Sequence, residues 1–235
     1  TCEMIEPVLT ELLAHYPGNV SVYVQDDPSF PKSIENKIDD TSLEFSYKNN
    51  VEIVPTLICS TQSKETDRTF GWDKSEWQKL TKISSLGKDL DDFKPGCGSK
   101  TQEPGMEEQL AARFDKELLV SRNIQLADLE DEIESCYERG WSDGLPVVPP
   151  TTVRVIRMLR GTNRSPGEII GNIPPDNVPC SIEKVAINAV LAGCKPDYFP
   201  VVLASVEAAL KDRFCMHGLL CTTYFSGPVM IVNGP

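Results

Sequence analysis

The sequence is short of three features that mark common classes of protein: long apolar runs, basic residues and paired CxxC cysteines. No apolar run approaches the ~18 residues that a membrane-spanning helix needs, so the sequence predicts no such helix. Lysine and arginine number 23 against 35 aspartates and glutamates, which gives a net charge of −12. This balance argues against partners such as nucleic acid or anionic membrane surfaces, because binding them needs clustered basic side chains.

The chain nevertheless has eight cysteines, which are scattered rather than paired: Cys2, Cys59, Cys97, Cys136, Cys180, Cys194, Cys215 and Cys221. A disulfide-rich secreted scaffold is usually shorter and denser in cysteine. We therefore predict a reducing compartment, the cytoplasm, with some thiols taking part in chemistry and several simply buried.

The first 82 residues alternate between helical and strand patterns. Apolar spacing predicts a first helix that contains Pro7 and ends at Pro17-Gly18. Strand patterns follow at 20–24 and 51–60, separated by a polar loop that passes into a helix ending at Asn49-Asn50. TDRTFGW predicts a third strand, and DKSEWQKL predicts a helix capped by Asp73 or Ser75.

Two motifs in this region resemble those of the thioredoxin family. CEMIEPVL, from Cys2, is similar to the active-site helix with its kink proline, and VEIVPTL is similar to the segment with an apolar residue, a cis-proline and a threonine. The resemblance covers residues 1–82 and implies a thioredoxin-like domain that lacks its first strands. It also implies that Cys2 is the second, resolving cysteine of a CxxC pair, and that Val54 and Pro55 present an edge to substrates.

The resemblance has two departures. The attacking cysteine would lie two residues before Thr1, which suggests that the chain is a fragment, and Glu3 stands where the family usually has a basic residue. The alternative is that Cys2 is a core thiol and that Pro55 marks an edge strand.

Residues 83–125 have the composition of a connector, rich in glycine, proline, serine and charge. Cys97 lies there in PGCGS, where a thiol is accessible, and it is a candidate exchange partner for the first domain. A loop cysteine without a role is the alternative. The segment MEEQLAARFDKELL is amphipathic and is expected to pack on a neighbour.

A second α/β domain, with helices packed on a sheet, is predicted for residues 126–235. Its helices are expected at IQLADLEDEIESCYER, VRVIRMLR, SIEKVAINAVLAG and DYFPVVLASVEAALKD, and its strands at GLLCTTYF and PVMIV. Asp197 is the expected cap of the last helix, and Glu183 and Lys184 are expected at an exposed edge. Trp141 and Asp143, in a turn-rich loop, are candidate site residues. A bacterial family of unknown chemistry is resembled by two stretches of this domain, GWSDGLPVVPPT and the run from SIEKVAINAV to SGPVMIVNGP. The Asn-Gly pair near the end is a turn signal, which predicts that a further strand follows.

Cys215, His217 and Cys221 form the densest cluster of potential metal ligands in the sequence. A soft metal such as zinc would suit them, with Cys180 or Cys194 as a fourth ligand, although the spacing matches no common zinc pattern. His217 is also a candidate general acid or base, since the chain has only one other histidine, His15.

These patterns favour a thiol-dependent redox protein, whose first domain exchanges disulfides with or for the second. Cys2 would resolve the mixed disulfide, Val54 and Pro55 would present the edge that binds the substrate, and Cys97 would relay the disulfide between the two domains. Its expected partners are protein or small-molecule thiols and disulfides. No bound cofactor is expected, and the sequence leaves open whether the protein forms a homo-oligomer. The alternatives are a metal-dependent enzyme that uses the Cys/His cluster, and a non-catalytic interaction module.

Overall fold

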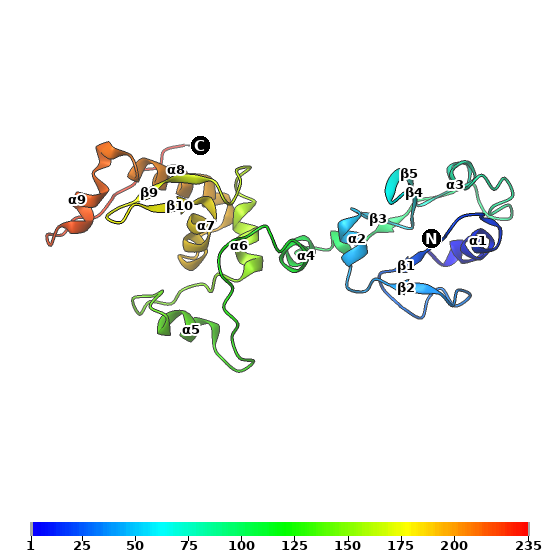
Figure 1. Ribbon diagram of the computed structural model, residues 1–235, viewed down its shortest axis with the longest axis horizontal. Coiled ribbons are helices and arrows are strands. Elements are labelled where there is room, and N and C mark those ends of the chain that lie inside the picture. The colour runs from blue at the N-terminus through cyan, green and yellow to red at the C-terminus, as the bar shows by residue number, and fades with distance from the viewer. Residues whose placement is uncertain (1, 235) are drawn as a thin grey trace. The chain divides into compact units, whose positions relative to one another are not determined.

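Helices and short strand pairs are mixed along the described chain, residues 2–234 of the computed structural model (Figure 1). The predicted mixed α/β class is therefore confirmed. Contacts divide the chain into two units, Thr1–Leu110 and Ala111–Pro235. Within residues 2–234, no helix has both the length and the apolar character needed to cross a membrane.

Helix α1 (Cys2–His15) forms where the apolar spacing predicts it, and it continues through Pro7. The proline removes one backbone donor near the start of the helix, and its ring is exposed rather than packed. Ile5, Val8 and Leu12 share the buried face of α1.

The core of the first unit forms where α1 packs against two tryptophans and Leu86. Trp72 and Trp77 are fully buried, with ring centroids 5.4 Å apart. Each indole N–H is satisfied, since Trp72 donates to the Asp91 carbonyl at 2.6 Å and Trp77 donates to the Gly71 carbonyl at 3.0 Å. The main hydrophobic cluster of this unit therefore lies between the buried face of α1 and these tryptophans.

The strands of the first unit form four separate pairs. Three pairs are antiparallel: β3 (Ile53–Val54) pairs with β8 (Cys97–Gly98), β4 (Thr56–Thr61) pairs with β5 (Lys64–Phe70), and β6 (Trp72–Asp73) pairs with β7 (Phe93–Lys94). The fourth pair is parallel and joins β1 (Val22–Val24) to β2 (Lys37–Asp39). The strands predicted around 20–24, 51–60 and 66–72 are confirmed with different bounds: the first is shorter, the second is divided into β3 and β4, and the third is shifted to β5. Strand β2 lies where the sequence suggested only a polar loop, because its pairing with β1 outweighs its polar composition.

Aspartate carboxylates hold the starts of two short helices in this unit. The first turn of α2 (Glu44–Lys48) is bound by the buried Asp40 carboxylate, which accepts from the N–H groups of Phe45 at 2.9 Å and Ser46 at 3.0 Å. Helix α3 (Lys74–Thr81) begins as predicted at Asp73, whose side chain accepts from the Glu76 N–H.

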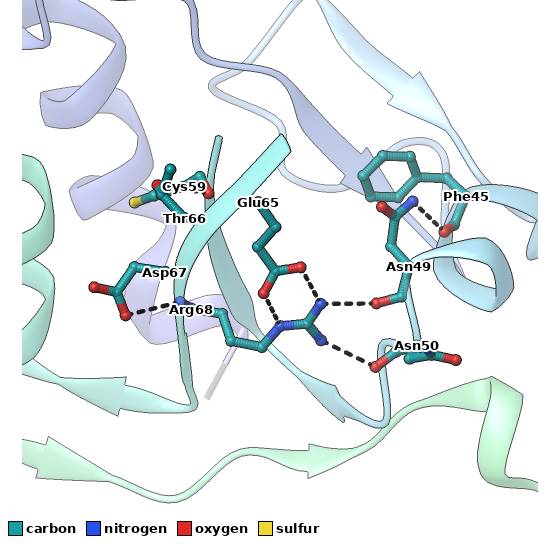
Figure 2. A network of polar contacts seen from close by, with 8 residues as sticks. All are labelled: Phe45, Asn49, Asn50, Cys59, Glu65, Thr66, Asp67 and Arg68. Atoms are coloured by element: carbon teal, nitrogen blue, oxygen red, sulfur yellow. Dashed lines mark hydrogen bonds and ion pairs between the residues drawn. The ribbon is translucent and has the colours of Figure 1, made fainter. Parts of the chain in front are cut away.

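Arg68 connects β5 to the end of α2 (Figure 2). Its guanidinium forms two bonds to the Glu65 carboxylate, and it donates to the carbonyls of Asn50 at 3.1 Å and Asn49 at 3.0 Å. Carbonyls at a helix C-terminus have no partner within the helix, so the guanidinium supplies one. This arrangement holds the segment that leads into β3.

The first unit reaches past residue 82, into the expected connector. Leu86 is fully buried in its core, and β7 and β8 pair with β6 and β3. A 3-10 helix (Lys100–Gln102) and α4 (Met106–Phe114) follow. We call residues 93–102 the strap.

Five α-helices, the last of them short, and one strand pair begin within the described part of the second unit, together with the 3-10 helices Pro196–Tyr198 and Asp212–Phe214. Their bounds are α5 (Glu132–Glu138), α6 (Thr152–Leu159), β9 (Ile169–Ile173), β10 (Val178–Ser181), α7 (Ile182–Leu191), α8 (Phe199–Ala209) and α9 (Met216–Cys221). Antiparallel β9 and β10 pair with each other. The core combines α6, α7 and α8 with Cys180 of β10.

Local signals predicted two of the helix starts in this unit, since the side chains of Thr151 and Ser181 cap α6 and α7 as expected. The helix expected from residue 124 begins only at Glu132, where the Asp131 side chain caps α5. Asp197 does not cap α8, since it lies within a 3-10 helix (Pro196–Tyr198) that leads into α8.

The two strands predicted after residue 218 are wrong for the described chain. GLLC belongs to α9, and residues 222–234 contain neither helix nor strand. A strand needs a partner for its backbone groups, and no described segment pairs with 229–232.

Candidate functional site

Cys2 lies at the start of α1, with its side chain half-buried. Burial raises the pKa of the Cys2 thiol above its ordinary value of 9.0, because it disfavours the thiolate, and the charge on Cys97 raises this pKa further. Free N–H groups at a helix start can donate hydrogen bonds to a developing thiolate, so the position still suits thiol chemistry. Cys2 is therefore a protonated thiol at neutral pH that can ionise when it reacts.

The pKa of Cys2 leads to a first prediction. Alkylation of Cys2 by iodoacetamide, followed by peptide mass analysis, should rise with pH through a midpoint above 9.0 in the folded chain. In denaturant the midpoint should fall back to the ordinary value, because burial and the nearby thiolate are lost. Equal midpoints in the folded and unfolded chains would contradict this description of Cys2.

Cys97 lies on β8 and is exposed. In the β3–β8 pair its Cα stands opposite Val54, and Gly98 stands opposite Ile53. The Val54–Pro55 peptide is cis, and the Pro55 carbonyl accepts from the Gly71 N–H at 2.8 Å. The structure therefore places Cys97 beside the two residues that the sequence marked as a substrate edge.

The structure thus brings two of the predicted sites together, since Cys97 lies opposite Val54 in a strand pair. For Cys2, the relation to Cys97 is electrostatic: the charge on Cys97 raises the pKa of Cys2. A third thiol of this unit, Cys59, lies on β4 opposite Asp67. Burial raises the pKa of Cys59, and the Asp67 carboxylate raises it further.

The predicted Cys/His cluster lies in the second unit. Cys215 precedes α9 with a left-handed φ of 53°, and His217 and Cys221 lie within α9, all three with exposed side chains. Across residues 2–234, no three His, Cys, Asp or Glu side chains are grouped so that they could hold a metal ion. Cys180 is buried in the core beside β9, and Cys194 follows α7.

The turn-rich loop with Trp141 and Asp143 has local contacts. Asp143 accepts from the Leu145 N–H at 3.3 Å, and the Ser142 hydroxyl accepts from the Gly144 N–H and donates to the Leu145 carbonyl. Both candidate residues have exposed side chains. These contacts are those of an Asx-type turn.

Glu183 corrects the expectation of an exposed edge. Its side chain is 1% exposed, and its carboxylate accepts from the N–H groups of Val120 at 3.0 Å and Ser121 at 2.8 Å. Burial alone raises the pKa of Glu183, but the hydrogen bonds from Ser121 and Val120 outweigh burial and hold the pKa below its ordinary value of 4.5. Lys184 is exposed and donates to the Ser121 hydroxyl at 2.8 Å.

Sequence reasoning missed the residues that fix the strap. Ser99 and Thr101 are buried, and Gly96 lies against β3, although their surroundings in the sequence look like a flexible loop. The two glycines that flank Cys97 in PGCGS were the available signal, because glycine permits close approach of two backbones. Comparison with known families, with curated proteins and with solved structures finds no match to this chain.

Proposed function

We propose that the first unit carries out thiol–disulfide exchange, with Cys97 and Cys2 as the reacting pair. The observation that carries this proposal is the β3–β8 register, which holds the exposed Cys97 opposite Val54. The charge on Cys97 also raises the pKa of Cys2, which supports these two thiols as the pair. The resemblance of CEMIEPVL and VEIVPTL to thioredoxin motifs supports the same reading.

The reaction consists of two exchange steps. The Cys97 thiolate attacks one sulfur of a substrate disulfide, forms a mixed disulfide and releases the other half as a thiolate, which takes up a proton. Cys2 then loses its proton and attacks the Cys97 sulfur, which releases the second half. Two protein thiols become one disulfide while one substrate disulfide becomes two thiols, so electrons and protons balance.

The two thiols suit different steps. Cys97 is exposed and can meet a substrate, whereas the half-buried Cys2 cannot easily do so. Burial keeps Cys2 protonated until the mixed disulfide forms beside it, and the helix start can then stabilise its thiolate. Val54 acts by pairing with Cys97 and so holding it in place, and Pro55 acts by holding the Gly71 turn, which lies against Gly96.

The test is the rate at which the fully reduced chain reduces 2-hydroxyethyl disulfide. Replacing the attacking thiol, in Cys97→Ser, should lower this rate by at least about 100-fold, because the covalent step is lost. Cys221→Ser is the matched control, since Cys221 is also exposed but lies in the second unit, and it should keep the wild-type rate. Equal rates in wild type and Cys97→Ser would contradict the proposal.

A further inference from the structure

The strap occupies the edge of β3 that lies beside Cys97. Cys97 and Gly98 form an antiparallel pair with Val54 and Ile53. The pairing continues beyond β8, because the Ser99 N–H donates to the Glu52 carbonyl at 2.8 Å. Extended peptides commonly bind by adding a strand to a free sheet edge, and this edge is already taken by the chain itself.

Gly96 brings the strap unusually close to β3. A Cβ atom at this position would lie 2.3 Å from the Ile53 side chain and 2.8 Å from the Val54 carbonyl oxygen. On the other side, a Cβ at Gly71 would lie 2.6 Å from the Gly96 nitrogen. The strap therefore runs between β3 and the Gly71 turn with no room for a side chain at residue 96.

Buried polar contacts hold the far end of the strap. The Thr101 hydroxyl donates to the Val51 carbonyl at 2.7 Å, and the Ser99 hydroxyl donates to the Gln25 amide oxygen at 3.0 Å. Gln25 in turn donates to Ser46 at 2.6 Å, which connects the strap to the buried Asp40. Releasing the strap would leave these buried groups without partners, which is costly.

We propose that the strap restricts the exchange site to low-molecular-weight disulfides by keeping the β3 edge from polypeptide substrates. This inference rests on the proposed function and adds the class of substrate to it. A small disulfide can reach the exposed Cys97 without pairing with any backbone. A polypeptide disulfide that bound as an added strand beside Val54 would first have to displace the strap.

The experiment compares two substrates in single-turnover reactions of the fully reduced chain: 2-hydroxyethyl disulfide, and an unstructured synthetic peptide dimer joined by one disulfide. The wild type should reduce the small disulfide at least about tenfold faster, the penalty expected when only a minor population has released the strap. Gly96→Ala should raise the rate on the peptide dimer and bring the two rates together, because its Cβ forces the strap off β3.

Gly98→Ala is the matched control within the strap, since a Cβ at Gly98 meets no atom within 4 Å. It should keep the wild-type ratio of rates. Thr101→Val is a second way to loosen the strap, because it removes the bond to Val51 without placing an atom against β3. It should shift the ratio in the same direction as Gly96→Ala.

The outcomes separate this inference from the proposed function. If the wild type reduces the peptide dimer as fast as the small disulfide, or if both strap variants keep the wild-type ratio, the strap does not select substrates although the exchange activity stands. If the wild type reduces neither disulfide, the proposed function fails, and the substrate class falls with it.

Discussion

When the fully reduced chain meets excess 2-hydroxyethyl disulfide without any added reductant, replacing Cys2 by serine is expected to halve the mercaptoethanol released, from two per chain to one, because the thiol that resolves the mixed disulfide on Cys97 is lost. Cys97 is still able to attack, so the variant should release one mercaptoethanol per chain and then stall. The stalled chain carries the other half of the probe on Cys97, and intact-protein and peptide mass measurements detect it. This pattern differs from that of Cys97→Ser, which should take up no probe at the strap.

Cys59→Ser is the matched control for this experiment. Like Cys2, Cys59 is half-buried, lies in the first unit and has its pKa raised by burial. It pairs with Asp67 across β4 and β5, away from the strap pairing, and the variant should release two mercaptoethanol per chain, as the wild type does. The proposed roles would be wrong if Cys2→Ser also released two, or if Cys59→Ser stalled after one.

The second large effect is expected on the stability of the second unit. Replacing Glu183 by alanine leaves the N–H groups of Val120 and Ser121 without their acceptors and opens a void beside α7. Both bonds are part-buried and Val120 is exposed, so water can reach the freed N–H groups. At about 0.5–1.5 kcal/mol net for each lost hydrogen bond, we expect a loss of about 1–3 kcal/mol in the free energy of unfolding. Chemical denaturation of the full chain, followed by a signal from the second unit, measures this loss.

Glu138→Ala is the control, because Glu138 is exposed on α5 and its removal should change stability little. The pH dependence adds a test. The pKa of Glu183 is lower in the folded state than in the unfolded chain, so its contribution is present above about pH 4.5 and is lost as pH falls below that value. Glu183→Ala should therefore show a weaker loss of stability in acid than the wild type, and equal acid sensitivity would contradict the role given to this carboxylate.

Features set by neighbouring residues could be predicted from the sequence. Asp73, Thr151 and Ser181 cap their helices because a short polar side chain satisfies N–H groups two or three positions further on. The helix through Pro7 was likewise readable, since its apolar face repeats every three to four residues.

Features set by distant residues could not be predicted in this way. No local pattern indicates that Cys97 pairs with Val54, because register between separate strands depends on the packing of the whole unit. The sequence suggested that Glu183 is exposed, but its carboxylate accepts hydrogen bonds from the N–H groups of Val120 and Ser121, which lie 63 and 62 residues earlier in the chain. PVMIV has the composition of a strand, yet a strand forms only where a partner is available.

The candidate site shows the same division. The sequence identified Cys2, Val54, Pro55 and Cys97 one by one, from motifs and from the accessible setting of PGCGS. The structure pairs Cys97 with Val54 through the strap, and the residues that fix the strap, Ser99 and Thr101, carried no signal of their own. Their burial depends on contacts with Gln25 and Val51, which no short motif encodes.

The most direct test of the account is to identify the disulfide that forms during exchange. The fully reduced chain would be treated with one equivalent of 2-hydroxyethyl disulfide, its remaining thiols alkylated, and its peptides mapped by mass. We predict a single new linkage, between the Cys2 and Cys97 peptides, with the other six cysteines alkylated. Alkylation of both Cys2 and Cys97, with the disulfide elsewhere or not formed, would contradict the assignment of this pair as the reacting thiols.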